Sequence, residues 1–316
     1  MLKPLDAPLE PDEDDCCWLS AYLFFQGDIY TEACDRILLE VAAPFVRRCE
    51  AQGWITRHFF IRYSERGAHV RLRLHGAASV LEETVKPALL RHVEAVFPVD
   101  PADDPLVHWA AYEPEVDRYG GPEGVALAED FFWHSSDAAL AFIDQLGSGN
   151  RPGRLGKGLL AMTALLHAFL RDRAPAAALT HDYGTGYLKT LITDEDEQAR
   201  WERAFERGFD RQAEQLINVV HTVWEHLEDG GALPDVLGRY YHDMLAIQTR
   251  FAALQQQGRL TGGGVPLESY ARSVGQIVPS YLHMMNNRLG VRIEEEWYLS
   301  YLITRALEQP VGHAAL

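Results

Sequence analysis

Two arginines and two histidines alternate with apolar residues between positions 69 and 75, where the chain reads His-Val-Arg-Leu-Arg-Leu-His. This period of two is typical of a half-buried strand, so His69, Arg71, Arg73 and His75 are expected to share one face. The whole chain has 29 Lys and Arg against 46 Asp and Glu, a formal net charge of -17. A cationic face in so acidic a protein predicts a local anion-binding site. Cross-strand ion pairs with Asp or Glu remain the alternative.

A second strand is expected directly before this one. Residues 58–63 are rich in aromatic and β-branched side chains, and residues 64–67 form a short connection that ends in Gly. Such a pattern is typical of a β-hairpin. We therefore expect Arg62 to lie near the face that carries Arg71 and Arg73.

The segment 113–121 (Glu-Pro-Glu-Val-Asp-Arg-Tyr-Gly-Gly) follows a further strand candidate at 107–112. Its Pro and paired Gly indicate a loop, and loops at strand ends often carry functional residues. We expect Arg118 to join the strand arginines, and Glu115 to orient an arginine through a bidentate pair. A solvated loop with surface ion pairs is the alternative.

A polar stripe marks the helical segment near residue 285. Ser280, His283 and Asn287 share one helix face, while Leu282, Met285 and Leu289 share another and are expected in the core. Histidine is the side chain best suited to proton transfer near neutral pH, so His283 is a candidate acid or base. A histidine that only satisfies its hydrogen bonds at the core boundary is the alternative. The acidic runs 193–197 and 294–296 are interpreted as helix N-termini without chemistry.

Composition excludes several classes of protein. The net charge of -17 disfavours direct binding of nucleic acid, and there is no nucleotide-binding or metalloprotease motif. Four cysteines lie in the first 50 residues without the spacing of zinc ligands, so free thiols are expected, and we predict neither a metal nor a cofactor. The absence of a signal peptide or a membrane-spanning apolar run predicts a cytoplasmic protein.

The predicted elements divide the chain into a sheet-bearing and a helical part. A strand at 17–25, a helix at 30–52, the hairpin, a helix at 78–97 and a strand at 107–112 give the order β-α-β-β-α-β, which suggests a ferredoxin-like open sheet or half-barrel. The segments expected to be helical after this point are 122–148, 155–173, 195–228, 235–257, 267–288 and 293–309. The sequence thus predicts an α+β fold. An acidic, disordered N-terminus over residues 1–16 is expected to precede a single domain over 17–316, sheet-bearing at 17–121 and helical at 122–309.

These motifs, in their order and spacing, resemble one known family. They are Trp18 with its strand, the run 59–63, the run 69–73, the loop 114–121 and the polar stripe 280–289. Together they resemble the C-terminal, glutamate-eliminating domain of class I lanthipeptide dehydratases, which also exists as a free-standing thiopeptide-type bacteriocin biosynthesis protein. The resemblance extends from about residue 17 to residue 309.

The resemblance implies a lyase that removes glutamate from glutamylated Ser or Thr of a ribosomal precursor peptide and leaves dehydroalanine or dehydrobutyrine. It implies a separate partner that glutamylates the peptide from glutamyl-tRNA, so that this chain need not bind tRNA. It assigns catalysis to Arg73, Arg118 and His283. Residues expected to bind substrate are Arg71, Glu115, Arg62 and Asn287.

Two rival functions remain. Pyridine synthases of thiopeptide pathways resemble the same domain and carry out a formal [4+2] cycloaddition between two dehydroalanines. The other rival is a non-catalytic partner that binds the peptide or stabilises the glutamylating enzyme.

Overall fold

The computed structural model describes residues 15–97, 106–191 and 195–309. Two compact units divide the chain. The described part of the first consists of 15–29, 33–97 and 106–113, and that of the second of 30–32 and the residues from Pro114 onward. Most of the expected disordered N-terminus lies outside the described residues, but Cys16 already belongs to a strand. The single domain expected over 17–316 stays a prediction.

The first unit carries the predicted β-α-β-β-α-β order, which confirms the α+β fold class. Its strands and helices are β1 (Cys16–Phe24), α1 (Glu32–Arg36), η2 (Ile37–Ala42, a π-helical segment), α2 (Ala43–Ala51), β2 (Arg57–Tyr63), β3 (His69–Ala77), α3 (Ala78–Val80), η3 (Leu81–Val85, also π-helical), α4 (Lys86–Val96) and β4 (Val107–Ala110).

The sheet is antiparallel throughout and has the strand order β2-β3-β1-β4. This is the ferredoxin-like arrangement that the element order suggested. Tyr22 of β1 lies opposite Arg71 of β3, and Ser20 lies opposite Arg73. Because directly opposed residues share a face of the sheet, β1 and β3 present polar and aromatic side chains on the same side.

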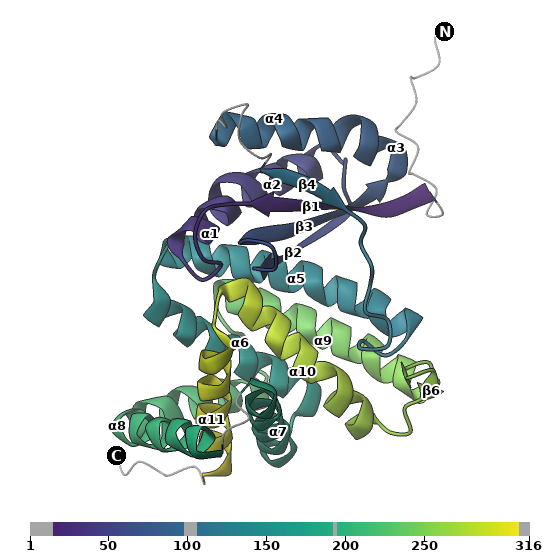
Figure 1. Ribbon diagram of the computed structural model, residues 1–316. Helices are drawn as coiled ribbons and strands as arrows, with labels where there is room; N and C mark the ends of the chain where they lie inside the picture. Colours follow the sequence, from purple (N-terminus) through teal and green to yellow (C-terminus); the bar gives the residue numbers. More distant parts are fainter. Residues whose placement is uncertain (1–14, 98–105, 192–194, 310–316) are drawn as a thin grey trace. The chain divides into compact units, whose positions relative to one another are not determined.

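The other face of the sheet is the apolar core of this unit. Leu23, Phe60, Val70 and Leu72 are all buried there. The segments α1–α2 and α3–α4 lie on this side, and η2 and η3 contact β3 (Figure 1). The period of two in β3 therefore separates core residues from site residues, as the sequence predicts.

The second unit is helical. Its elements are α5 (Pro122–Leu146), α6 (Arg151–Leu170), α7 (Arg173–Leu191), α8 (Glu195–Glu228), α9 (Asp235–Gln256), the short strands β5 (Thr261–Gly262) and β6 (Val265–Pro266), α10 (Tyr270–Leu289) and α11 (Ile293–Glu308). Of these helices, all except α7 were expected, and the short strands β5 and β6 pair with each other between the expected helical segments 235–257 and 267–288.

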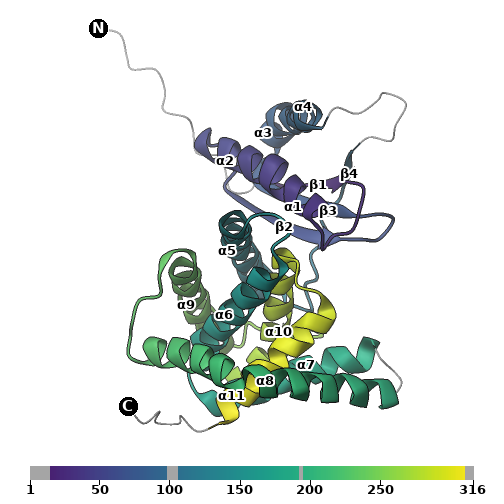
Figure 2. The ribbon, with the colours of Figure 1, turned by 90° about the vertical axis from the view of Figure 1, so that its left-hand side faces the viewer.

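Two helices organise this unit around the polar stripe. α10 packs against α5 and α6, while α11 packs against α7 and α8 (Figure 2). The side chain of Ser269 caps the start of α10, and Gly290, in the left-handed conformation, ends it and allows the turn into α11. This short connection brings the first turn of α11 next to the end of α10. Within the described residues, no helix is both long and apolar enough to cross a membrane.

Candidate functional site

Arg71 lies on the aromatic face of the sheet in the first unit. Its guanidinium carbon is 3.4 Å from the ring centroid of Tyr63 and 4.7 Å from that of Tyr22. Arg71 Nη2 also lies 3.8 Å from a carboxylate oxygen of the exposed Glu65. Aromatic faces attract a cation without neutralising its charge, so the positive charge remains available to an anion.

Arg73 is held in a similar way on the same face. Its guanidinium carbon lies 5.1 Å from the ring centroid of Phe59 and 4.8 Å from that of Tyr112. Trp18 packs edge-on against both of these rings. The expected common face of Arg71 and Arg73 is confirmed, and rings from three neighbouring segments surround it.

Arg62 is not part of this face, so the expectation that it lies near Arg71 and Arg73 is wrong. In the β2–β3 register Arg62 opposes Val70, which places it on the apolar side. Both Arg62 and Asp35 are 0% exposed, with Arg62 Nη2 donating to Asp35 Oδ1 at 2.9 Å. Arg62 Nη1 donates to the carbonyl of Ile29. A guanidinium enclosed in this way stabilises the sheet unit, and we no longer assign it to substrate binding.

Arg118 lies in the loop before α5, in the helical unit. Its Nη1 donates to both carboxylate oxygens of Glu115, at 3.2 and 3.1 Å. Its Nε donates to Ser280 Oγ at 2.9 Å. Glu115 therefore does orient an arginine, and both of its carboxylate oxygens accept from Arg118 Nη1. Gly120 and Gly121, with φ of 93° and 91°, form the turn that leads from this loop into α5.

The polar stripe on α10 brings distant residues together. Ser280, the partner of Arg118, is one helical turn before His283 on the same face. Asn287 lies one further turn along this face and is partly buried. The structure thus places Arg118 and His283 in one neighbourhood, whereas the convergence of Arg71 and Arg73 with them stays a prediction.

His283 contacts a buried carboxylate. Its Nδ1 lies 3.2 and 3.1 Å from the two carboxylate oxygens of Glu296, in the first turns of α11. The hydroxyl of Tyr183, from α7, donates to the same carboxylate. Glu296 is 3% exposed, while the side chain of His283 retains 17% exposure. Three helices therefore hold one imidazole that solvent still reaches.

The environment of Glu296 has opposing effects on its protonation. Burial raises the pKa of the Glu296 carboxyl above its usual value, whereas the His283 imidazole and the Tyr183 hydroxyl act to lower the pKa. A carboxylate that accepts from Nδ1 fixes the imidazole tautomer and its orientation. Because Nδ1 is engaged by Glu296, Nε2 is the nitrogen of His283 that is available for proton transfer.

Glu296 is a site residue that the sequence interpretation missed. The run 294–296 was interpreted as a helix N-terminus, which describes Glu295, whose side chain caps the backbone of Arg292. Glu296 instead occupies the buried face of α11, one turn before the buried Ser300. A carboxylate at a position that the helical period assigns to the core was the available signal.

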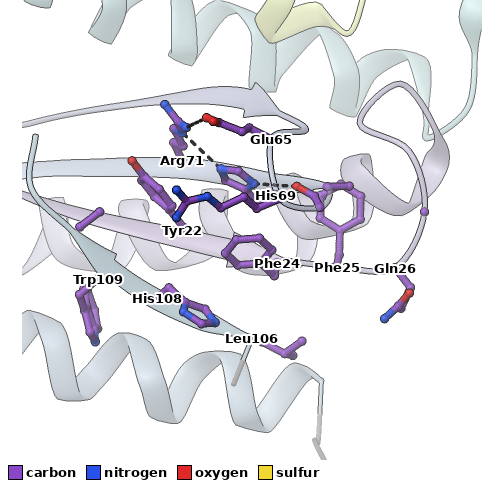
Figure 3. A pocket seen from close by; sticks show the side chains of 15 residues that line it. Tyr22, Phe24, Phe25, Gln26, Glu65, His69, Arg71, Leu106, His108 and Trp109 are labelled. Atoms are coloured by element: carbon purple, nitrogen blue, oxygen red, sulfur yellow. Dashed lines mark hydrogen bonds and ion pairs between the residues drawn. The ribbon is translucent and has the colours of Figure 1, made fainter. Parts of the chain in front are cut away.

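A pocket of about 960 Å³ opens at one end of the sheet in the first unit (Figure 3). Arg71 and His69 of β3 line it, together with the aromatic side chains of β1 and with His108 of β4. Arg73 is not among its lining residues. Among the described residues, no group of three or more His, Cys, Asp or Glu side chains is placed to hold a metal ion.

Three solved structures share the fold of this chain. TsrL has a TM-score of 0.69 at 21% identity, with 93% of this chain and 95% of TsrL covered. The pyridine synthase TbtD from thiomuracin biosynthesis has a TM-score of 0.69 at 17% identity, with 92% of this chain and 97% of TbtD covered. The tRNA-dependent lantibiotic dehydratase MibB from Microbispora sp. 107891 has a TM-score of 0.64 at 20% identity, with 97% of this chain but only 28% of MibB covered.

Sequence comparison gives a curated relative and a family. Over 80 residues the chain is 35% identical to the subtilin biosynthesis protein SpaB of Bacillus subtilis, a stretch of 25% of this chain and 8% of SpaB. The model of the family described as lantibiotic biosynthesis dehydratase, C-terminal, matches residues 18–307. The chain belongs to the lantibiotic biosynthesis dehydratase C-terminal family.

Proposed function

We propose that this chain is a lyase that eliminates glutamate from glutamylated Ser or Thr side chains of a ribosomal precursor peptide. The observation that carries the proposal is the pairing of a cation with a carboxylate-supported histidine on one face of α10. Arg118 bonds Ser280, and His283, one turn later, bonds Glu296. Elimination requires these two functions, a base and a group that stabilises a departing anion.

The chemistry follows from this arrangement. His283 Nε2 removes the α-proton of the glutamylated residue, and the electron pair forms the Cα–Cβ double bond. The Cβ–O bond breaks, and glutamate leaves as a carboxylate. Arg73 and Arg118 stabilise the charge on the leaving group, while the carboxylate of Glu296 stabilises the imidazolium that forms. A second role for His283, returning the proton, is compatible with the same geometry.

Substrate binding is assigned to Arg71, Glu115 and Asn287. The guanidinium of Arg71 lies against two tyrosine rings and keeps its positive charge, so it suits a further carboxylate of the glutamyl group. Glu115 supports Arg118, and Asn287 extends the polar stripe of α10. The partners are the glutamylated precursor peptide and a separate enzyme that glutamylates it from glutamyl-tRNA, and we place the reaction in the cytoplasm.

The second candidate is a formal [4+2] cycloaddition between two dehydroalanines. The observation that favours it is the common fold with the pyridine synthase TbtD, of which 97% is covered. The products distinguish the candidates. Elimination removes one glutamate per site, cycloaddition forms a ring and releases the leader peptide, and a non-catalytic binding partner changes no mass.

The test is a minimal mixture of the chain, a chelator and a chemically glutamylated Ser peptide, followed by mass spectrometry. We expect dehydroalanine to form without tRNA, ATP or metal. Replacement of Arg73, Arg118 or His283 by Ala should slow elimination by about 10²–10³-fold with the fold intact, the loss typical of a removed transition-state donor. Arg73→Lys should restore little, because one ammonium does not reproduce the guanidinium geometry. No loss of glutamate with the wild-type chain, even with the glutamylating partner added, would refute elimination.

A further inference from the structure

His69 is a buried histidine that lines the pocket of the first unit. It opens β3, and its side chain is 1% exposed. Its ring stacks on Tyr22 with centroids 5.0 Å apart and lies 4.6 Å from the ring of Phe24. The imidazole therefore has one fixed place among the aromatic rings of the sheet.

Both nitrogens of His69 have partners of opposite character (Figure 3). Nδ1 lies 2.9 Å from the carbonyl oxygen of Gly67, which only accepts hydrogen bonds, so Nδ1 must carry a proton. Nε of Arg71 lies 3.2 Å from Nε2, and an arginine nitrogen only donates, so Nε2 must accept. The two partners together require a neutral imidazole with its proton on Nδ1.

The hydrogen bond from Arg71 Nε to His69 Nε2 restricts the orientation of the guanidinium group. The guanidinium carbon of Arg71 lies close to the rings of Tyr22 and Tyr63, but ring contacts alone do not select one orientation of the group. Engagement of Nε by His69 selects one orientation and leaves the Nη nitrogens to meet a ligand. In the part of the chain that the structure describes, Arg71 Nη1 forms no hydrogen bond, and Nη2 approaches Glu65 at 3.8 Å.

We propose that His69 is a positioning residue for Arg71, and that its neutral imidazole holds the guanidinium in the orientation that binds a carboxylate of the peptide substrate. This inference rests on the proposed elimination function, in which Arg71 is a substrate-binding residue. A protonated His69 would direct an N–H at Arg71 Nε–H, and the hydrogen bond would be lost. Binding of the carboxylate therefore requires the neutral form.

The surroundings of His69 favour that form. Burial is the largest influence and lowers the pKa of His69, and the charges of Arg71 and His108 lower it further. The Gly67 carbonyl and Glu65 act to raise the pKa but do not reverse the shift. Since the pKa is lowered, the arrangement is intact above the ordinary histidine pKa of about 6.5 and is lost as the pH falls toward the lowered value.

Three substitutions separate the two hydrogen bonds of His69. His69→Gln places an amide oxygen near the position of Nε2 and keeps an acceptor for Arg71. His69→Asn places its amide nearer the position of Nδ1 and keeps only the bond to Gly67. His69→Phe keeps the stacking and removes both bonds. The matched control is His92→Gln on α4, because His92 also bonds a backbone carbonyl, that of Val41, at 3.2 Å but forms no hydrogen bond with an arginine among the described residues.

Steady-state elimination of glutamate from the glutamylated peptide measures the effect. We expect His69→Asn and His69→Phe to raise KM by about 10- to 100-fold with kcat nearly unchanged, as for a lost hydrogen bond to a charged group. His69→Gln should stay within about 3-fold of wild type, and the His92→Gln control should be unaffected. Activity preserved in His69→Asn and lost in His69→Gln would show that His69 acts through its bond to Gly67 in the hairpin loop, and it would overturn the proposal. Unchanged kinetics in all three variants would also overturn it.

A measurement without activity keeps this inference separate from the proposed function. Nitrogen-15 NMR of labelled protein, with His69→Gln used to assign the resonance, reports which ring nitrogen carries the proton. We expect the Nδ1–H tautomer at neutral pH, even for a preparation or variant that does not turn over. An Nε2–H tautomer or a charged ring at pH 7 would overturn the inference. The expected tautomer together with no elimination by the wild-type chain would instead count against the proposed function alone.

Discussion

Replacement of Glu296 by Gln tests whether the buried carboxylate controls the histidine on α10. The wild-type carboxylate accepts hydrogen bonds from Tyr183 and from His283 Nδ1. The amide of Glu296→Gln still offers an oxygen to Tyr183 but presents an NH₂ group to Nδ1. Nδ1 must then accept, and the proton moves to Nε2. We expect the resulting tautomer to slow elimination by about 10²–10⁴-fold, in the range seen when a catalytic histidine is held in the wrong tautomer.

Glu296→Ala and Glu296→Gln should differ strongly in their effect on the free energy of unfolding. Glu296→Ala leaves two donors without an acceptor in a site where the side chain was 3% exposed. Each such loss costs about 1–3 kcal/mol, so the two together should lower the free energy of unfolding of Glu296→Ala by about 2–6 kcal/mol. Glu296→Gln keeps the volume and hydrogen-bonding groups and should stay within about 1 kcal/mol of wild type. Urea denaturation measures both values.

The pH dependence of this stability has a definite sign. Because burial raises the folded-state pKa of Glu296, the linked stability is largest below its ordinary pKa and is lost as the pH rises through the raised value. The advantage of wild type over Glu296→Gln should therefore shrink as the pH rises above the ordinary glutamate pKa of about 4.3. The control is Glu308→Gln, an equal charge change at an exposed position of the same helix. Normal elimination by Glu296→Gln would refute the reasoning, as would equal stability of Glu296→Gln and Glu296→Ala.

Two further predictions concern folding. Arg62→Met should lower the free energy of unfolding by about 3–5 kcal/mol, because it leaves the carboxylate of Asp35 buried without its cation, and the double variant with Asp35→Leu should recover most of the loss in urea denaturation. A single variant of wild-type stability would contradict this. Gly121→Ala should destabilise by about 1–3 kcal/mol, because φ is 91° and a Cβ would lie 2.4 Å from Thr261 Oγ1. Gly147→Ala, at φ 76° with open space around it, should cost less, and an equal cost would show that the contact with Thr261 is unimportant.

The sequence predicted the parts of the site that depend on local periodicity. The period of two in β3 assigns Arg71 and Arg73 to one face, and the helical period assigns Ser280 and His283 to one stripe. Such patterns are readable because strand and helix geometry fix the direction of successive side chains.

The parts that failed depend on contacts between distant segments. Arg62 was placed on the wrong face because strand register was not readable, and its partner Asp35 lies on a helix. The role of Glu296 depends on Tyr183, which lies in α7, a helix that was not expected. The sequence of α7 includes a Pro and two Gly and has no clear apolar stripe, so packing against α11 defines this helix.

The division of the chain into two units is not a division into two continuous stretches of sequence. Residues 30–32 interrupt the sheet-bearing unit but belong to the helical one. There the carbonyl of Tyr30 accepts from Arg151, and its ring lies 5.5 Å from the guanidinium carbon of Arg292. A fragment that begins at Pro114 therefore lacks part of its own unit. An exchange of the sheet-bearing unit between relatives has to transplant two segments and keep residues 30–32 from the recipient.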